Sequence, residues 1–437
     1  MQSILLALPF GLLSLCCAQS TISSSNDTST QSSIPDSLTA LPTNSRATYD
    51  SYATTITLDS SSTNFANTTT GLSNSSSTST SSSNSTTSSL PGTRTTLLGT
   101  ASATATAEAN VKCNGYSEFC ERKYSNITYV VAHNSPFHIL HNAASNQIYD
   151  VTTQLDNGIR GLQSETHYVN DTVYLCHTSC DELNAGTLEA YLVKVKAWLD
   201  ANRYDVITIL LGNEDFIDPG NYTAPVTNSG LLDYVYVPDT VPMGIDGWPT
   251  LADMILKDKR AVMMLAYDAN QETVPWLLDM WSYQWQTPFS PTNVSFPCTV
   301  QRPPGQSREV SEQRLYLINH NLNAQFADST LGIDILIPDT ANINTTNANT
   351  TGIGTAATMI DTCVNEWGRN PNYLLVDYYN YGNFEGSTLA AAAKANNVTY
   401  NVDSCCGSSS TMNDALATFR PKVVALVAVL LAVLAIS

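Results

Sequence analysis

The amino-acid sequence predicts an α/β fold, a distorted (β/α)8 barrel, for residues 111–406. Two observations favour this fold. Continuous apolar segments alternate with helical segments, which is typical of a parallel sheet covered by helices on both faces. In addition, nearly every apolar segment ends in a polar residue, and polar residues at the carboxyl ends of strands favour a closed barrel over an open sheet.

Seven of the eight barrel strands can be placed from apolar segments of strand length. They are residues 129–133, 158–165, 172–177, 205–211, 260–267, 314–320 and 373–377. We expect the missing strand between Asp268 and Tyr373, or at residues 398–402.

Three helices are predicted between these strands. Apolar residues at i, i+3 and i+4 spacing predict a helix over residues 187–202, and Thr187 or Gly186 can cap its start. A short helix is expected at residues 251–257, opened by Thr250, and an alanine-rich helix around residues 388–395.

The rest of the chain is not expected to contribute to the barrel. Residues 1–19 are typical of a secretory signal peptide, and residues 20–110 form a Ser/Thr-rich segment that we expect to be a disordered, O-glycosylated stalk. Residues 407–437 end in a hydrophobic run that is shorter than the roughly 20 residues needed to cross a bilayer. We therefore expect a GPI-attachment signal there, with a C-terminal transmembrane tail as the alternative.

Charge and glycosylation signals indicate the compartment and the partners. The formal net charge of −19 argues against a nucleic-acid partner, because no basic stripe is present to neutralise phosphates. N-glycosylation sequons indicate export and surface positions. The expected GPI anchor would attach the exported protein to the membrane at the cell surface. The sequons lie at Asn126, Asn170, Asn221, Asn293, Asn344, Asn349 and Asn397.

The cysteines of the exported chain predict four disulfides. They are Cys113, Cys120, Cys176, Cys180, Cys298, Cys363, Cys405 and Cys406. Short loops predict that Cys113 bonds Cys120 and that Cys176 bonds Cys180. A bond between the adjacent Cys405 and Cys406 would be strained, so we expect these two to reach Cys298 and Cys363. A zinc site at Cys176, His177 and Cys180 is the alternative, although the spacing is not typical of zinc.

The segment from Tyr129 to Cys180 carries the candidate active site. Its first predicted strand ends in His133 and Asn134, and its third ends in His177. The second places Gln163, Glu165 and His167 on one face, because side chains alternate along a strand. Two histidines and a carboxylate at strand ends indicate general acid–base chemistry on a phosphoester or a similar bond.

These motifs give the chain a resemblance to a known family. The motifs are 132–135 (Ala-His-Asn-Ser), 158–163, 175–180, 282–289 and 317–323. Over residues 113–405 the sequence resembles secreted fungal members of the phosphatidylinositol-specific phospholipase C-like phosphodiesterases. That resemblance implies that His133 is the general base on the inositol 2-hydroxyl. It also implies that His177 protonates the leaving diacylglycerol oxygen.

The chain departs from the bacterial enzymes of this family at the phosphate. Those enzymes carry an Asp-x-Arg pair on the second strand, whereas this chain has Gln163 and Glu165 there, without the arginine. The calcium-dependent eukaryotic enzymes carry His-Asn after the first strand and further acids. By that resemblance Asn134, Glu165 and Glu214 could hold Ca²⁺ or Mg²⁺ through oxygen ligands.

The remaining candidates are assigned by position. Asp377 ends the last predicted strand and is expected to orient a catalytic histidine. Arg160, Gln163 and His167 are the candidates for substrate binding. Strand parity turns Arg160 away from the other two, which favours a structural ion pair for it.

The leading hypothesis for the function is a cell-surface phosphodiesterase that acts on a phospholipid headgroup or a glycosylphosphatidylinositol. Its main alternative is a catalytically inactive, glycosylated wall or adhesion module on the same barrel, which the absent arginine favours. A glycosidase that uses Glu165 and Glu214 is a third possibility. The pair of histidines favours phosphoryl chemistry over this third reading.

Overall fold

The computed structural model describes residues 56–57, 111–139, 142–328 and 333–401. The predicted signal peptide, the GPI-attachment signal, and Cys405 and Cys406 lie outside these ranges. Within the predicted stalk only Ile56–Thr57 (β1) is described, and this segment pairs antiparallel with Thr240–Val241 (β7).

Eight parallel strands form the central sheet, and they follow one another around it in chain order. They are β2 (Tyr129–Ala132), β3 (Gly161–Val169), β6 (Ile207–Asn213), β8 (Ala261–Ala266), β9 (Leu277–Asp279), β10 (Gln284–Gln286), β11 (Leu315–Asn319) and β14 (Tyr373–Val376). The last strand, β14, pairs with the first strand, β2. The sheet is open between β9 and β10, which short helix α5 (Met280–Tyr283) connects. The predicted distorted (β/α)8 barrel is therefore confirmed.

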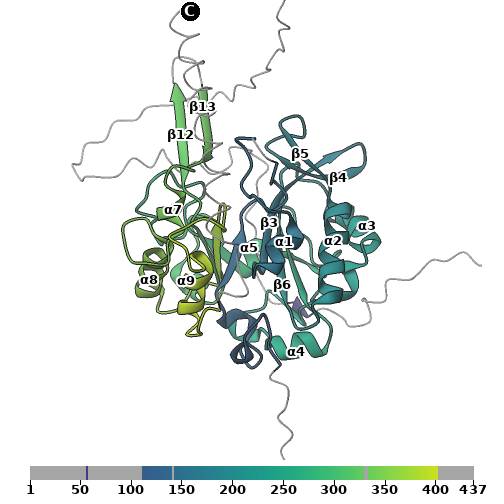
Figure 1. Cartoon of the computed structure of the whole chain (residues 1–437). Helices are drawn as coiled ribbons and strands as arrows, with labels where there is room; N and C mark the ends of the chain where they lie inside the picture. Colours follow the sequence, from purple (N-terminus) through teal and green to yellow (C-terminus); the bar gives the residue numbers. More distant parts are fainter. Residues whose placement is uncertain (1–55, 58–110, 140–141, 329–332, 402–437) are drawn as a thin grey trace, which may run out of the picture.

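One of the predicted barrel strands is wrong. Residues 172–177 form β4 (Thr172–His177), which pairs antiparallel with the end of β3 and with β5 (Leu183–Thr187). Strands β4 and β5 extend beyond the carboxyl end of the barrel part of β3 (Figure 1). The two barrel strands that were not placed, β9 and β10, lie between Asp268 and Tyr373, where the missing strand was expected. No strand forms over the described residues 398–401.

Helices cover the outside of the barrel (Figure 1). The α-helices besides α5 are α1 (Val151–Asp156), α2 (Leu188–Ala201), α3 (Thr223–Asn228), α4 (Leu251–Leu256), α6 (Arg308–Glu312), α7 (Ile343–Thr346), α8 (Ala356–Trp367) and α9 (Thr388–Ala395). Single 3-10 turns lie at Ser117–Phe119, Tyr124–Asn126, Pro219–Tyr222, Leu231–Tyr234 and Ile245–Gly247. A second hairpin, β12 (Asn323–Asp328) with β13 (Ile333–Pro338), follows β11.

The three predicted helices are confirmed. The Thr187 side chain caps α2 by accepting a hydrogen bond from the Ala190 amide. Thr250 and Asp253 form a reciprocal capping box at the start of α4. The alanine-rich helix is α9.

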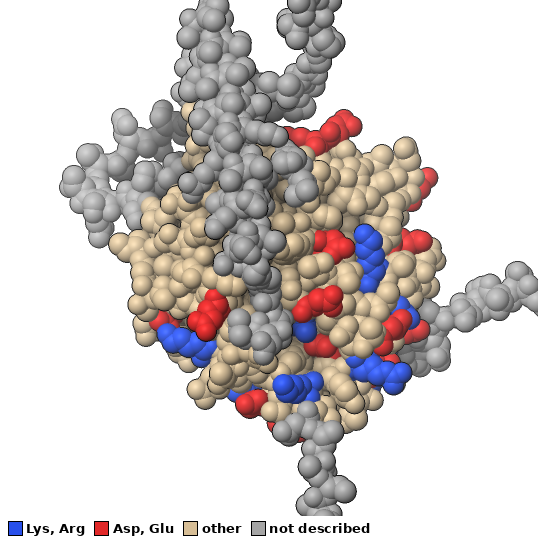
Figure 2. Space-filling view, in the orientation of Figure 1, with Lys and Arg blue, Asp and Glu red and all other residues tan. Residues whose placement is uncertain are grey.

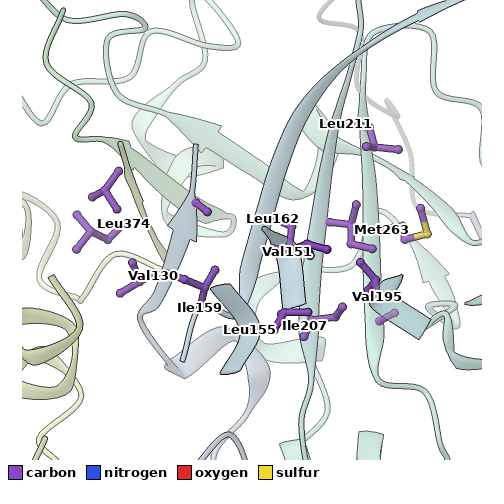
Figure 3. Close-up of a cluster of buried hydrophobic side chains, with 14 of the residues drawn as sticks. Val130, Val151, Leu155, Ile159, Leu162, Val195, Ile207, Leu211, Met263 and Leu374 are labelled. Carbon is purple, nitrogen blue, oxygen red and sulfur yellow. The ribbon is translucent and has the colours of Figure 1, made fainter. Parts of the chain in front are cut away.

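Two hydrophobic clusters separate the inside of the barrel from its outside. Alternate strand residues such as Val130 and Leu162 face α1 and α2, where they meet Leu155 and Val195 (Figure 3). The residues between them belong to the cluster inside the barrel, for example Val131. Because side chains alternate, the inward positions at the strand ends carry the polar residues that form the candidate site. The residues at these inward positions include His133, Gln163, Glu165 and Asp377.

Close packing at the contact between β2 and β3 requires a glycine. Gly161 pairs in register with Val131, and a Cβ added to Gly161 would lie 2.5 Å from Val131 Cγ2. We expect Gly161→Ala to lower the free energy of unfolding by about 1–3 kcal/mol, because the stiff valine side chain must shift. Denaturant unfolding measures this effect. Gly244→Ala is the control, since nothing lies within 4 Å of its added Cβ, and equal losses in both variants would contradict the packing argument.

The described cysteines form three disulfides. Cys113–Cys120 and Cys176–Cys180 are bonded as predicted. The predicted bonds from Cys298 and Cys363 to the chain's end are wrong, because these two cysteines bond each other across 65 residues. The bond between Cys176 and Cys180 also removes the thiolates that the zinc alternative required.

Charged side chains are mixed on the surface of the face in view. Lys and Arg lie among Asp and Glu there (Figure 2). The absence of a nucleic-acid partner stays a prediction. Among the helices of the described ranges, none has the length and apolar character needed to cross a bilayer.

Candidate active site

His133 and Asp377 are in direct contact at the carboxyl ends of β2 and β14. The Nδ1 atom of His133 lies 2.7 Å from Asp377 Oδ1. Both groups are buried, His133 to 9% exposure and Asp377 to 1%. A carboxylate only accepts hydrogen bonds, so Nδ1 carries the proton and Nε2 is left as an acceptor. In the described structure Nε2 makes no hydrogen bond, so it is available to take a proton from a bound hydroxyl.

Amide side chains fix this pair in place. Asn146 donates a hydrogen bond of 2.8 Å to Asp377 Oδ1, and Asn134 donates one of 3.2 Å to Asn146 Oδ1. Gln147 donates to the backbone carbonyl of His133 at 2.7 Å. A histidine held by its strand, its carboxylate and these amides has little freedom to leave the geometry needed for proton transfer. None of the supporting amides, Asn134 apart, was predicted from the sequence.

Gln163 positions the loop that follows His133. Its side-chain Oε1 accepts a hydrogen bond of 2.8 Å from the Asn134 amide, and its carbonyl accepts one of 2.8 Å from the Ser135 amide. The φ angle of Asn134 is +47°, a left-handed conformation that asparagine tolerates better than most residues. Gln163 therefore holds the loop, and its predicted role in substrate binding stays a prediction.

His177 stands at the end of β4, outside the barrel sheet. Its ring meets Phe137 edge-on with a centroid distance of 5.3 Å, and Phe137 follows His133 by four residues. The adjacent Thr178 donates its amide to Glu165 Oε2 at 3.0 Å, and the Cys176–Cys180 disulfide closes the loop. These contacts bring His177 to the same mouth of the barrel as His133. Its side chain is partly exposed, as a group that exchanges protons with a ligand must be.

Glu165 and Glu214 lie next to each other on β3 and just after β6. A Cβ added to Gly212 would lie 2.7 Å from Glu214 Oε1 and 3.7 Å from Glu165 Cα, so the missing side chain makes room for the Glu214 carboxylate. Burial, and then the Glu165 carboxylate, raise the pKa of Glu214 to about 7, while the Arg302 guanidinium acts to lower it. Two carboxylates in this relation would be stabilised by a cation.

The predicted metal ligands fit a hard divalent cation by their chemistry. Glu165 and Glu214 supply carboxylate oxygens, and the Oδ1 atom of Asn134 is buried without a hydrogen-bond partner. Within the described part of the chain, however, no three His, Cys, Asp or Glu side chains gather into a group that could bind a metal. The site for Ca²⁺ or Mg²⁺ therefore stays a prediction.

Two further candidates occupy different places. Arg160 precedes β3 at the opposite end of the barrel, forms a 2.9 Å ion pair with Asp205 and lies over the Trp198 ring. It forms the structural ion pair that strand parity favoured, and the structure does not bring it together with the other predicted site residues. His167 lies in the hairpin beyond the barrel, with Nδ1 3.1 Å from Asp215 Oδ1. Its role in substrate binding stays a prediction.

Sequence reasoning missed Arg302, which also faces the barrel mouth. It follows β10 by 16 residues and is 7% exposed. The family motifs at residues 282–289 and 317–323 lie on either side of Arg302 in the sequence. No motif in the loop that contains Arg302 predicts a site residue there. Only its effect on Glu214 and its burial identify it.

His320, in contrast to His133, is a structural histidine. It is fully buried after β11, and its Nε2 donates to the Thr346 carbonyl at 2.7 Å. Burial lowers the pKa of His320 to about 4. In the unfolded chain this residue binds a proton below about pH 6.5. In the folded chain it binds a proton only below about pH 4.

Acidification should consequently destabilise the protein through His320. We expect the free energy of unfolding to fall by up to about 3 kcal/mol from this residue as the pH drops from 6.5 to 4. Urea unfolding of wild type and His320→Gln across this range isolates the contribution, because the variant should show the shallower dependence. Parallel curves would mean that His320 titrates normally in the fold.

Comparisons with known proteins identify the family of this chain. The family described as PI-PLC X 1, the PI-PLC X domain, matches residues 119–391. A secreted protein of Arthroderma benhamiae is 53% identical over 300 residues, which cover 69% of this chain and 67% of that protein. A PI-PLC X domain-containing protein of the same organism is 37% identical over 298 residues, which cover 68% of this chain and 92% of its own.

Among solved structures, the phosphatidylinositol-specific phospholipase C from Listeria monocytogenes matches with a TM-score of 0.40 at 13% identity. This match covers 63% of this chain and 95% of that one. The family match spans the barrel from the first 3-10 turn to α9 and includes every predicted catalytic residue. On the family match and the 37% identical relative, the chain belongs to the PI-PLC X domain family of phospholipase C-like phosphodiesterases.

Proposed function

We propose that this protein is an exported phosphodiesterase that cleaves the headgroup of an inositol phospholipid or a glycosylphosphatidylinositol. The observation that carries the proposal is the buried contact between His133 Nδ1 and Asp377 Oδ1, which leaves Nε2 of His133 as an acceptor at the barrel mouth. A second histidine, His177, stands at the same mouth as the proton donor.

The reaction is a transfer of the phosphoryl group to an internal hydroxyl. Nε2 of His133 takes the proton of the inositol 2-hydroxyl, and that oxygen forms a bond to phosphorus. The bond from phosphorus to the diacylglycerol oxygen breaks, and His177 gives that oxygen a proton. The products are a cyclic inositol phosphodiester and diacylglycerol, and the two histidines exchange their protonation states.

A bound cation would supply charge stabilisation that the two histidines cannot. Asn134, Glu165 and Glu214 would hold Ca²⁺ or Mg²⁺, which would neutralise charge on the phosphoryl oxygens. The hydrogen bond from Thr178 to Glu165 couples that site to the loop of His177. Glu165 would thereby position the acid as well as the cation.

Features around the mouth support a lipid substrate. The hairpin of β12 and β13 extends from the carboxyl end of β11, and Phe326, Ile335 and Leu336 on it are between 39% and 46% exposed. Ile139, in the loop after His133, is 43% exposed. Apolar side chains beside a site that takes a lipid headgroup can contact the surface of the membrane.

Export is supported by the sequence and by a relative. The related Arthroderma protein is named a secreted protein, and the sequons and three disulfides agree with an oxidising compartment. Attachment through a GPI anchor belongs to the same proposal, and release from membranes by a GPI-cleaving phospholipase tests it.

The test of the function is release of water-soluble inositol phosphate from phosphatidylinositol vesicles by the full chain. The assay is run with Ca²⁺, with Mg²⁺ and with chelator, because the cation requirement is part of the proposal. Turnover that disappears with chelator and returns with one cation supports the predicted site. Absence of turnover in all three conditions, with GPI-linked substrates also uncleaved, would replace the enzyme with a binding module.

A further inference from the structure

The proposed reaction places a phosphate in the barrel mouth, and β3 carries no arginine to meet its charge. Arg302 is a cation that no motif assigned. Strand β10, which borders the opening of the barrel, fixes its backbone. The Gln286 amide donates to the Arg302 carbonyl at 2.8 Å, and the Arg302 amide donates to the Gln286 carbonyl at 3.4 Å. This antiparallel bridge uses the edge of β10 that lacks a strand neighbour. Arg302 therefore lies where the barrel is open between β9 and β10.

The side chain of Arg302 is held entirely by neutral groups. Its guanidinium donates to Gln286 Oε1 at 2.8 Å and to the Tyr267 hydroxyl at 3.3 Å. It also lies over the Phe289 ring at 3.8 Å and over the Trp281 ring at 5.4 Å from the centroids. Aromatic rings and an amide orient a planar guanidinium without neutralising it.

Arg302 lacks the carboxylate partner that Arg160 and Arg260 have. Arg160 pairs with Asp205, and Arg260, 2% exposed, pairs with Asp258. Among the described residues, no carboxylate lies within 4.0 Å of Arg302, and its Nε–H is buried without a hydrogen-bond partner. A buried charge with an unused donor is costly unless an anion completes it.

The guanidinium of Arg302 lies inside the barrel, where it contacts Tyr267 and Trp281 of the inner hydrophobic cluster. Its charge acts on Glu214 at the mouth, and its partner Tyr267 lines a cavity of about 490 Å³ at the ends of β6, β8 and β9. Tyr267 therefore lies between this cavity and the guanidinium of Arg302. The groups that hold Arg302 leave its charge for a ligand.

We propose that Arg302 binds the phosphate group of the substrate. From the opening between β9 and β10 it supplies the positive charge that β3 lacks. The inference rests on the proposed function for the identity of the ligand. The binding of a phosphate at Arg302 does not depend on turnover. Charge-assisted hydrogen bonds from a preorganised guanidinium would strengthen as charge develops on the phosphoryl oxygens.

Three variants of the full chain test this role. Arg302→Gln removes the charge, Arg302→Lys keeps the charge without the planar fork, and Arg160→Gln is a matched control that removes an arginine from the other end of the barrel. Cooperative thermal unfolding in chloride buffer identifies the variants that fold. On phosphatidylinositol vesicles, we expect Arg302→Gln to lower kcat/KM by about 10²–10³-fold and Arg160→Gln to leave it within a few fold.

A binding measurement separates this role from a structural one. The Tm of the wild type should rise with inorganic phosphate at constant ionic strength, and more with the phosphodiester glycerophosphoinositol, while uncharged inositol serves as the blank. Arg302→Gln should lose both shifts, and Arg160→Gln should keep them. A shift with glycerophosphoinositol alone would assign the site to the diester headgroup, and equal shifts would assign it to phosphate in general.

The outcomes distinguish the two proposals. If the wild type cleaves no phosphodiester but its phosphate-dependent shift requires Arg302, the function is wrong and the anion site stands. If Arg302→Gln keeps both kcat/KM and the shift, the anion site is wrong whatever the wild type cleaves. Should Arg302→Gln fail to fold, Arg302→Lys decides: at least a tenfold loss in kcat/KM supports the role, and wild-type values contradict it.

Discussion

Replacing either His133 or His177 by alanine is expected to lower kcat by about 10²–10⁴-fold. His133 removes a proton that must leave before the inositol oxygen can attack phosphorus. His177 supplies the proton without which the diacylglycerol oxygen is a poor leaving group. Water in the vacated space can replace neither, because it is not held at the required position. Release of inositol phosphate from vesicles, followed at saturating substrate, measures both losses.

The pH dependence of the wild type adds a second readout for the same pair. One histidine must be neutral and the other protonated, so the rate should be bell-shaped in pH. Each single variant should lose one limb of that curve along with most of its rate. His138→Ala is the control, since His138 lies in the same loop as His133 and takes no part in the mechanism. Wild-type rates in both active-site variants would refute the assignment.

The barrel could be predicted because its strands follow simple rules. Segments such as residues 205–211 and 373–377 are continuous apolar runs that end in polar residues, and in the structure they form β6 and β14 within one residue or two of those bounds. Side-chain alternation also placed Glu165 on the inner face and Arg160 on the outer one. The same rule places His133 and Asp377 on the inner face, and the pairing of β2 with β14 makes them neighbours.

The parts that could not be predicted depend on pairing between distant segments. The run from Thr172 to His177 has the apolar character of a barrel strand, yet it folds back on β3 because a two-residue turn at Asn170 and Asp171 brings it there first. Strands β9 and β10 have three residues each, too few to show a pattern. Arg302 is held near Glu214 by a bridge to β10. No motif in the loop of Arg302 predicts that bridge.

The disulfide connectivity failed for a related reason. Sequence spacing identifies bonds that close short loops, as it did for Cys176 and Cys180. Cys298 and Cys363 are 65 residues apart, and their proximity depends on how α8 packs on the barrel. The sequence around each cysteine does not predict that packing.

The second large effect is expected for Asp377→Asn. The carboxylate is 1% exposed and contacts His133 at 2.7 Å, while Asn146 donates to the same oxygen. The Oδ2 atom has no partner in the described structure. A buried carboxylate in this position fixes the Nδ1–H tautomer and stabilises the positive charge that His133 gains with the proton. An asparagine of the same shape keeps a hydrogen bond but cannot stabilise that charge.

Asp377→Asn should therefore lower kcat by about 10²–10⁴-fold while KM changes little, because Asp377 acts through His133 and does not touch the substrate. Nitrogen NMR of the imidazole should show a proton on Nδ1 in the wild type and a mixture of tautomers in the variant. Asp205→Asn is the matched control, since that carboxylate pairs with Arg160 at the other end of the barrel. A normal kcat together with a shifted tautomer would show that the orientation of His133 does not limit the reaction.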